Sequence, residues 1–258
     1  MIAEARVQKD GARRILAVED DPDLLRLIAR ELSSAGFEVW SAPTAERALE
    51  LIGERGLPHL ALVDILLPGL DGLELCRRVQ EWSDLPIVLL TSVHEEKTVV
   101  DSIQRFAEDY IVKPFNPREM VARVERVLRR IGDFAYCLQP VVRIDDRLSI
   151  DFAQQRALLE GRPVPLTSTE TKLLYVLMRN AGRVVETPFL LRRLWPVDEV
   201  FEDTLRVHIH RLRGKIEPVP SRPRFIITER GTGYRFPLPP PSPASPASPS
   251  APPSPVTS

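Results

Sequence analysis

Cysteine and long apolar runs are both scarce in this chain of 258 residues. The two cysteines, Cys76 and Cys137, form no metal-ligand or redox spacing, which is typical of a protein from a reducing compartment. The amino terminus has no apolar signal core, and no apolar run approaches the ~20 residues that a membrane span requires. These absences predict a soluble, cytoplasmic protein that does not associate with a membrane.

The net charge of −1 hides a difference between two halves of the chain. Residues 1–132 carry 18 Lys and Arg against 23 Asp and Glu, whereas residues 133–258 carry 17 against 13. Most of the basic excess lies in residues 204–236, with eight basic and two acidic side chains. The length predicts two domains, and the charge of the second predicts a charged partner such as nucleic acid.

The first half alternates between apolar strands and amphipathic helices. Strands are predicted near 14–18, 37–41, 59–64, 86–91 and 109–112, and helices near 22–35, 44–55, 72–82, 95–106 and 117–131. Repeated strand–helix units of this kind predict an α/β domain in which helices cover both faces of a parallel sheet.

Polar side chains end four of these strands. Glu19 and Asp20 follow the first strand, Asp64 the third, Thr91 the fourth and Lys113 the fifth. The carboxyl ends of parallel strands converge on one crevice. Three carboxylates, a hydroxyl and an ammonium group there predict a site for a divalent cation and a phosphoryl group, because a hard cation such as Mg²⁺ prefers oxygen ligands.

Asp64 is the best-placed nucleophile, because it ends the central strand and the turn-forming run Leu67-Pro68-Gly69 follows it. Thr91 is placed to donate to a phosphoryl oxygen, and Lys113 to neutralise its charge. Taken singly, each residue has a simpler interpretation. Asp20-Asp21-Pro22 would cap a helix, and one Thr at a strand end is usually structural. The ordered combination favours the phosphoryl site.

The segments 16–21, 63–72, 90–92 and 109–115 resemble the receiver domain of bacterial two-component response regulators. The resemblance implies a flavodoxin-like (βα)₅ fold with Asp64 as phosphoacceptor. It also implies a Mg²⁺ or Mn²⁺ site formed by Glu19, Asp20, Asp64 and the main-chain carbonyl of Leu66. In the same family, residues that match Thr91 and Tyr110 report phosphorylation. The residue that matches Lys113 binds the phosphate, and a cis peptide usually joins it to a proline, here Pro114.

Two positions depart from the receiver pattern. Glu19 replaces the commoner Asp, which alters the reach of one metal ligand, and Phe106 stands where Gly is usual. The resemblance implies dimerisation through the helices 95–106 and 117–131, so Phe106 bears on the dimer geometry. Ion pairs across that face are expected from Lys97, Asp101, Glu108, Asp109, Arg118 and Arg123.

The second half is predicted to be α+β. Strands are expected at 138–144, 148–152 and 156–159, followed by a helix that a capping box from Thr167 to Glu170 opens. Further helices are predicted at about 187–195 and 203–217, and a hairpin with a Gly-containing tip at 224–236. The chain after residue 236 is almost entirely Pro, Ser and Ala, a composition that predicts disorder.

The helix at 203–217 has one apolar stripe, formed by Leu205, Ile209, Leu212 and Ile216 at helical spacing. The opposite face carries basic side chains, which suits the major groove of DNA, although a solvated cationic face is the simpler alternative. The expected DNA contacts on this helix are Thr204, Arg206, Val207, His210, Arg211, Arg213 and Lys215.

The segments 166–170, 207–213 and 228–236 resemble the winged helix-turn-helix output domain of the OmpR/PhoB family. The resemblance implies that helix 203–217 enters the major groove and that the hairpin tip, with Arg230 and Thr232, also contacts DNA, Arg230 in the minor groove. It further implies that the loop 196–202 contacts RNA polymerase. Arg206, where an acid is common, and Gly214, which weakens a helix, depart from the family pattern.

Together these features predict a transcriptional response regulator of a two-component phosphorelay. The expected parts are a receiver at 13–131, a linker at 132–137, a winged helix-turn-helix domain at 138–236 and a tail at 237–258. A sensor histidine kinase, double-stranded DNA, RNA polymerase and a second copy of the chain are the expected partners.

Two alternatives remain open from the sequence. A phosphohydrolase resembling haloacid dehalogenases would also use an Asp, a Thr or Ser and a Lys, but it places a second Asp where this chain has Leu66. The prediction is therefore that the chain is not a turnover enzyme. A DNA-binding protein that ignores phosphorylation is the other alternative, which the intact acidic residues, Thr91 and Lys113 disfavour.

Overall fold

The first sheet of the protein is parallel and has five strands. The computed structural model describes residues 12–92, 107–131, 139–196 and 200–239. The strand order is β2-β1-β3-β4-β5, the doubly wound order of the flavodoxin-like fold. The central strand is buried at every position, as expected for a strand covered on both faces. The strands are β1 (Arg14–Val18), β2 (Glu38–Ala42), β3 (Leu60–Asp64), β4 (Ile87–Ser92) and β5 (Asp109–Lys113).

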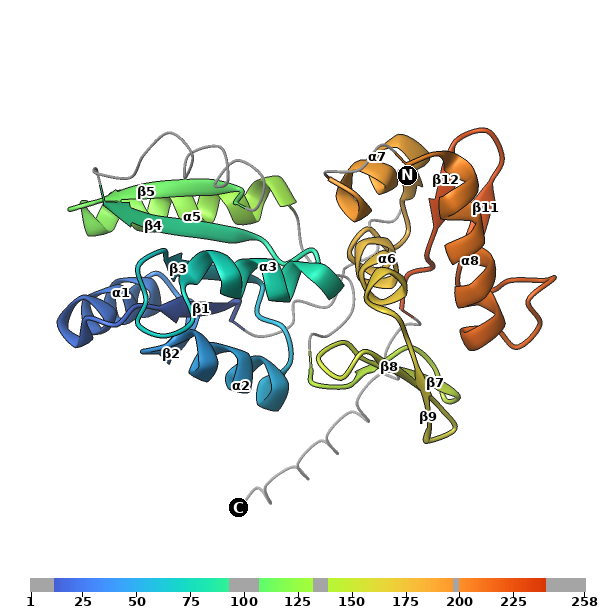
Figure 1. The fold of residues 1–258 in the computed structure, drawn as a ribbon, viewed down its shortest axis with the longest axis horizontal. Helices are drawn as coiled ribbons and strands as arrows, with labels where there is room; N and C mark the ends of the chain where they lie inside the picture. Colours follow the sequence, from blue (N-terminus) through green and yellow to red (C-terminus); the bar gives the residue numbers. More distant parts are fainter. Residues whose placement is uncertain (1–11, 93–106, 132–138, 197–199, 240–258) are drawn as a thin grey trace, which may run out of the picture.

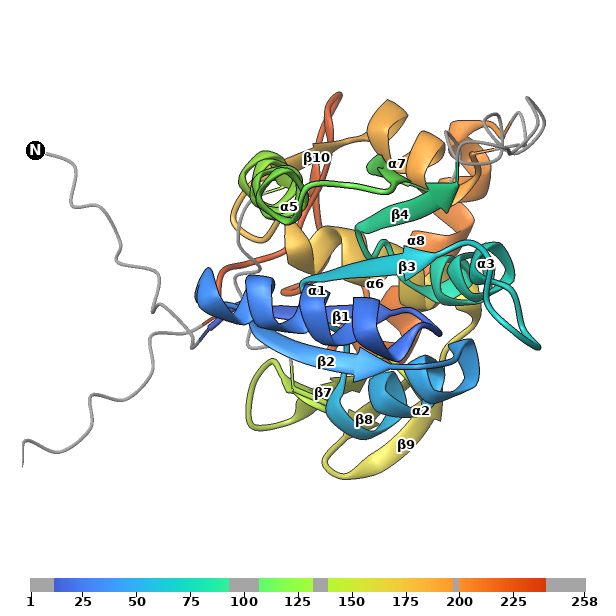
Figure 2. The ribbon, with the colours of Figure 1, turned by 90° about the vertical axis from the view of Figure 1, so that its left-hand side faces the viewer.

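Helices cover both faces of this sheet, which confirms the α/β prediction (Figure 2). Helices α1 (Pro22–Ser34) and α5 (Pro117–Ile131) pack on one face, and α2 (Ala45–Arg55) and α3 (Gly72–Trp82) on the other. Each helix buries one apolar stripe against the strands, the usual behaviour of an amphipathic surface helix. The helix predicted at 95–106, with Phe106, lies outside the described residues.

An antiparallel sheet of four strands opens the second half. Its strands are β6 (Val142–Arg143), β7 (Leu148–Asp151), β8 (Arg156–Leu159) and β9 (Arg162–Pro165), in that order. The strand predicted at 138–144 is shorter, because Asp145 accepts hydrogen bonds from the Arg147 and Leu148 amides and turns the chain. Strand β9 was not predicted. It contains two prolines, which is compatible with its place at the sheet edge.

Three helices and a second small sheet complete the winged-helix arrangement (Figure 1). The helices are α6 (Ser168–Arg179), α7 (Thr187–Leu194) and α8 (Glu202–Ile216). The sheet has the order β10-β12-β11, from β10 (Val184–Glu186), β11 (Ile227–Glu229) and β12 (Gly233–Arg235). Helix α6 starts with the predicted capping box.

The predicted hairpin is confirmed, but its first strand starts at Ile227 and not at 224. The amides of Arg224, Phe225 and Ile226 donate to the Glu217 carboxylate, so this segment is held at the end of α8. The hairpin also gains the third strand, β10, which is only three residues long and therefore gives a weak sequence pattern. No helix in the described ranges has both the length and the apolar character of a membrane span.

Candidate functional site

Three carboxylates meet at the carboxyl ends of β1 and β3. Oxygens of Glu19, Asp20 and Asp64 all lie within 4.8 Å of one another. Glu19 and Asp64 are 1% and 4% exposed, whereas Asp20 faces solvent. The simpler interpretation, helix capping, applies to Asp21 instead, since its side chain accepts from the Asp23 and Leu24 amides at the start of α1. Asp20 therefore does not serve as the cap of this helix.

Lys113, at the end of β5, joins two of these carboxylates. Its Nζ atom lies 2.6 Å from Glu19 Oε2 and 2.6 Å from Asp64 Oδ2. Burial lowers the pKa of Lys113, but the two carboxylates outweigh this and raise it above its ordinary value. Burial, together with the charge of Asp64, raises the pKa of Glu19 although Lys113 opposes the shift. The Lys113–Pro114 peptide is cis.

The chemistry of the donor set fits a hard divalent cation. Carboxylate oxygens are the ligands that Mg²⁺ and Mn²⁺ prefer, and the exposed side of Asp20 leaves room for the waters that Mg²⁺ retains. The Leu66 amide donates to Asp64 Oδ1 at 3.2 Å, so the main chain of Leu66 lies beside this carboxylate. Glu19, Asp20 and Asp64 are the residues that could hold the ion.

A close approach of two main-chain segments fixes the position of Asp64. The Gly72 amide donates to Ile65 O at 3.0 Å, and a Cβ atom at position 72 would lie 1.9 Å from the Asp64 carbonyl oxygen. Asp71 caps α3 through the Glu74 amide and so sets where the loop ends. The sequence motif contains Gly72, but sequence reasoning did not assign it this positioning role.

Thr91 and Tyr110 lie on the neighbouring strands β4 and β5 but differ in exposure. Thr91 is buried, 6% exposed, and its hydroxyl donates to Ser92 O at 3.3 Å. The Tyr110 side chain is 49% exposed. The hydroxyl is therefore enclosed at the sheet edge, whereas the aromatic ring lies open to solvent.

Two of the acidic residues expected on the dimer face, Asp109 and Glu108, form ion pairs within the chain. Asp109 pairs with Arg126 at 2.5 Å and with Arg123 at 3.4 Å, and Glu108 pairs with Arg130 at 2.5 Å. Arg118 is exposed, and Lys97 and Asp101 lie outside the described residues.

Helix α8 buries the predicted stripe of Leu205, Ile209, Leu212 and Ile216. On the opposite face Val207 is 46% exposed, and Thr204, His210 and Arg211 are also exposed. Arg206 forms ion pairs with Glu202 and Asp203 on the first turn of the same helix.

Two further basic side chains on α8 bind groups on other elements of the domain. Arg213 donates to Ile226 O at 3.0 Å and to Thr228 Oγ1 at 2.8 Å, which joins α8 to β11. Lys215 lies 2.6 Å from the Glu170 carboxylate and donates to Pro165 O. At the hairpin tip, by contrast, Arg230 and Thr232 are exposed.

The loop before α8 ends one residue earlier than expected. Helix α8 begins at Glu202, so the loop predicted at 196–202 ends at Phe201, and residues 197–199 lie outside the described ranges. Phe201 is 80% exposed, a feature that sequence reasoning did not single out. Its aromatic character directly before the start of α8 was the available signal.

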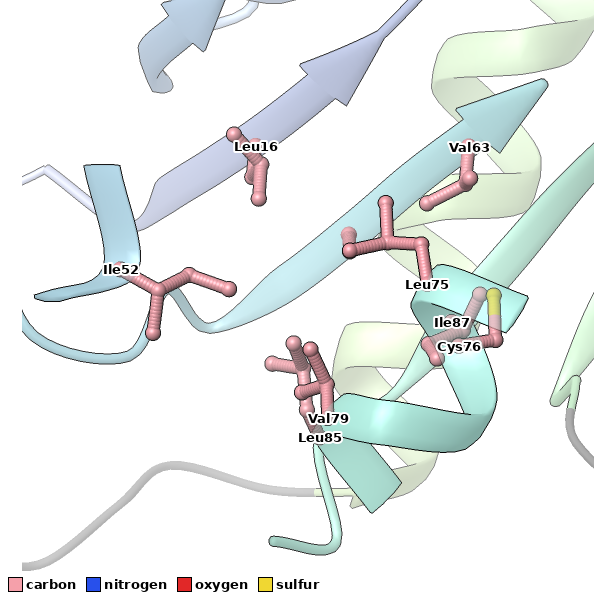
Figure 3. Close-up of a pocket in the computed structure, with 9 residues that line it drawn as sticks. Leu16, Ile52, Val63, Leu75, Cys76, Val79, Leu85 and Ile87 are labelled. Carbon is pink, nitrogen blue, oxygen red and sulfur yellow. The ribbon is translucent and has the colours of Figure 1, made fainter. Parts of the chain in front are cut away.

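A small cavity between the first sheet and helices α2 and α3 is apolar, unlike the crevice that holds the carboxylates (Figure 3). Its lining is apolar and includes Leu16, Val63, Leu75 and Cys76. Burial raises the pKa of the Cys76 thiol to about 12, so the thiol stays protonated. A lining without carboxylate, hydroxyl or ammonium groups cannot serve the phosphoryl chemistry expected at the crevice.

Comparison with known proteins gives matches over both halves. Residues 15–125 match the response regulator receiver domain, and residues 161–236 match the family described as "Transcriptional regulatory protein, C terminal". The phosphate regulon transcriptional regulatory protein PhoB of Escherichia coli is 37% identical over 229 residues, covering 87% of this chain and 98% of PhoB. The probable transcriptional regulator ycf27 of Galdieria sulphuraria is 34% identical over 237 residues, covering 88% and 92%.

Among solved structures, the response regulator DrrB of Thermotoga maritima, an OmpR/PhoB homologue, is 32% identical. The match covers 88% of this chain and 99% of DrrB, with a TM-score of 0.42.

Proposed function

Because the chain belongs to the OmpR/PhoB family of DNA-binding transcriptional response regulators, we propose that Asp64 is its phosphoacceptor and that a sensor histidine kinase is the phosphoryl donor. The observation that carries the proposal is the convergence of Glu19, Asp20, Asp64 and Lys113 on one crevice. The proposal includes a receiver at 13–131, a linker at 132–137, an output domain at 138–236, a tail from 237 and a cytoplasmic location.

The chemical step follows from the positions of these side chains. One Asp64 carboxylate oxygen forms a bond to phosphorus while the bond from phosphorus to the donor histidine nitrogen breaks, and the electron pair leaves with that nitrogen. In the unphosphorylated chain, Lys113 donates a hydrogen bond to Asp64 Oδ2. After transfer, Lys113 would neutralise the charge of one phosphoryl oxygen, and the Thr91 hydroxyl would donate to another. A divalent ion, held by Glu19, Asp20, Asp64 and the Leu66 carbonyl, would stabilise the negative charge that develops during transfer.

Phosphorylation is then transmitted to the surface of the receiver. Thr91 would move toward the phosphoryl group, and the exposed Tyr110 ring would turn inward, which changes the face formed by residues 95–106 and 117–131. Two receivers would pair through the proposed dimer face, which contains Lys97, Asp101, Glu108, Asp109, Arg118 and Arg123. Pairing places two output domains on neighbouring DNA half-sites and raises the effective concentration of the second contact.

The output domain would read DNA through α8 and the hairpin tip. Val207, His210 and Arg211 present an exposed face suited to the major groove, and Arg230 would enter the minor groove. The other proposed contacts are Thr204, Arg206, Arg213, Lys215 and Thr232. Three of these, Arg206, Arg213 and Lys215, would each first have to release a present partner inside the domain. The loop that ends at Phe201 is proposed to contact RNA polymerase.

A phosphohydrolase is the strongest alternative from another class, and the crevice argues against it. The position of the second catalytic acid holds Leu66, an apolar residue that is 61% exposed. Without an acid–base side chain at that position to activate water, the acyl phosphate is not rapidly hydrolysed, so it persists long enough to be sensed. The protein is therefore proposed to be a switch and not a turnover enzyme.

The test compares wild type with Asp64→Asn and with Asp23→Asn, an exposed Asp on the first turn of α1. Each protein is incubated with Mg²⁺ and acetyl phosphate, and covalent phosphate is measured by intact mass. We expect a phosphorylated species and tighter binding to operator DNA for wild type and Asp23→Asn only. Equal DNA binding by wild type and Asp64→Asn, with and without the donor, contradicts the switch. Steady hydrolysis of a phosphate monoester by wild type supports the enzyme instead.

A further inference from the structure

Helix α8 begins without a side-chain cap and carries two acids on its first turn. Phe201, at the N-cap position, makes no capping hydrogen bond, and Glu202 and Asp203 follow it. Acids at the amino terminus of a helix stabilise it through the helix dipole, which is the simplest role for both side chains. On a helix that is proposed to enter the major groove, each acid also faces a polyanion and lowers the affinity for DNA. A helix-capping role alone therefore leaves this arrangement only partly explained.

Both acids bind the guanidinium group of Arg206, one turn further along the same helix. Arg206 Nη2 lies 3.1 Å from Glu202 Oε2, and Nη1 lies 3.0 Å from Asp203 Oδ1. A guanidinium has five N–H donors, so these two hydrogen bonds leave others free. Ion pairs at exposed positions add little to stability. Their main effect here is to hold a long side chain in a narrow range of positions.

The two acids differ in their surroundings. The Asp203 side chain is 88% exposed, whereas that of Glu202 is 57% exposed. Burial raises the pKa of Tyr234 on β12, the charge of Arg206 opposes this rise, and the charge of Glu202 adds to it. Glu202 and Arg206 thus both lie near the hairpin. A Glu four residues before an Arg is also the favourable order for a pair on a helix. Glu202 is therefore the more persistent partner, and Asp203 is the one that solvent can replace.

The position of Arg206 suits a contact with a base. Arg206 lies in the amino-terminal half of α8, next to Val207, which is 46% exposed. In helix-turn-helix proteins, the amino-terminal residues of the recognition helix contact base edges in the major groove. The planar guanidinium can donate two parallel hydrogen bonds to N7 and O6 of a guanine, which a lysine cannot reproduce. A side chain that is already held in position loses less conformational entropy when it binds.

We propose that Arg206 reads a guanine of the operator half-site while Glu202 holds its guanidinium in position, and that Asp203 is released to solvent. Arg206 thus determines specificity, and Glu202 is its positioning residue. The inference rests on the proposed function, because it requires α8 to enter the major groove. Arg206 stands where an acid is common in the family, so we expect this guanine preference to be particular to this chain.

The test begins with selection of operator sequences from a random duplex library by the full wild-type chain. Affinities for the selected duplex and for its single-base-pair variants are then measured with wild type, Arg206→Ala and Arg206→Lys. We expect both variants to lose about tenfold of the preference for one G·C pair and to keep the preferences at other positions. Replacing that guanine by 7-deazaguanine, which lacks N7, should weaken binding by wild type and not by Arg206→Ala.

Glu202→Ala and Asp203→Ala are the matched pair that tests the positioning role. Each removes one acid from the first turn of α8, so both should bind every duplex more tightly than wild type. Only Glu202→Ala should also lose several-fold of the preference for the same guanine. Circular dichroism checks that both variants keep the helix. An equal guanine preference in these two variants means that Glu202 does not position Arg206.

Two further results overturn the reading of guanine by Arg206. One is an unchanged guanine preference in Arg206→Ala. The other is a uniform loss of affinity in Arg206→Ala with a salt slope reduced by about 0.9, which indicates a phosphate contact. If Arg211→Ala loses sequence preference while Arg206→Ala keeps it, the inference fails and the proposed function stands. If wild type selects no sequence at all, both fail.

Discussion

The main chain at Gly72 passes so close to Asp64 that any side chain there would displace the proposed phosphoacceptor. We expect Gly72→Ala to destabilise the receiver by about 1–3 kcal/mol or more, because a Cβ atom 1.9 Å from a carbonyl oxygen forces a backbone shift. The shift also moves Asp64 relative to Lys113, so phosphorylation by acetyl phosphate should fall beyond what the loss of folded protein explains. Urea unfolding and intact mass measure the two effects separately.

Gly53→Ala provides the matched control for this substitution. Gly53 lies on the exposed side of α2, and a Cβ atom there meets nothing within 4 Å. Replacing a helical Gly by Ala at such a position stabilises a helix by roughly 0.5–1 kcal/mol. If Gly72→Ala matched Gly53→Ala in both stability and phosphorylation, the positioning role assigned to Gly72 would be wrong.

At the scale of elements, α8 combines a buried stripe with a weak point. Gly214 lies on this helix and a Cβ atom there has open space, so Gly214→Ala should stabilise the output domain by roughly 0.5–1 kcal/mol. Affinity for DNA should change little, because the methyl group adds no charge. Gly233→Ala is the contrasting variant, since its Cβ atom would lie 2.0 Å from Val185 O and part β12 from β10. Stability is measured by urea unfolding, and a destabilised Gly214→Ala would contradict the helix assignment.

The elements that could be predicted from the sequence are those whose pattern is local. Strands β3 and β5 end on Asp64 and Lys113, and Glu19 directly follows β1, so these strand ends are visible within a few residues of sequence. The stripe on α8 repeats at helical spacing. Strands β9 and β10 could not be predicted in this way, because they are short and depend on partners elsewhere in the domain. The burial of α6 also escaped prediction. Its sequence shows one apolar face, and the second face becomes buried only through contact with another domain.

At the scale of the whole molecule, the two halves of opposite charge meet through ion pairs. Asp84 and Glu108 of the acidic half form ion pairs with Arg179 and Arg193 of the basic half. These ion pairs use only part of the basic excess, since Arg211 and Arg230 stay exposed on α8 and the hairpin tip. The overall charge of −1 thus conceals a basic surface that remains available to a polyanion.

This division of charge predicts how DNA affinity depends on salt. Removing one side chain that binds a phosphate should reduce the slope of log affinity against log salt by about 0.9, because fewer counterions are released. We expect that reduction for Arg230→Ala, and none for Arg162→Ala, an exposed arginine on β9.

Arg211→Ala should instead lose about 1–3 kcal/mol of discrimination between operator and random duplex, because an arginine in the major groove reads bases. Binding isotherms of the full chain from about 50 to about 200 mM salt separate the two effects. An unchanged slope for Arg230→Ala, or full discrimination by Arg211→Ala, means that α8 and the hairpin tip are oriented on DNA in another way.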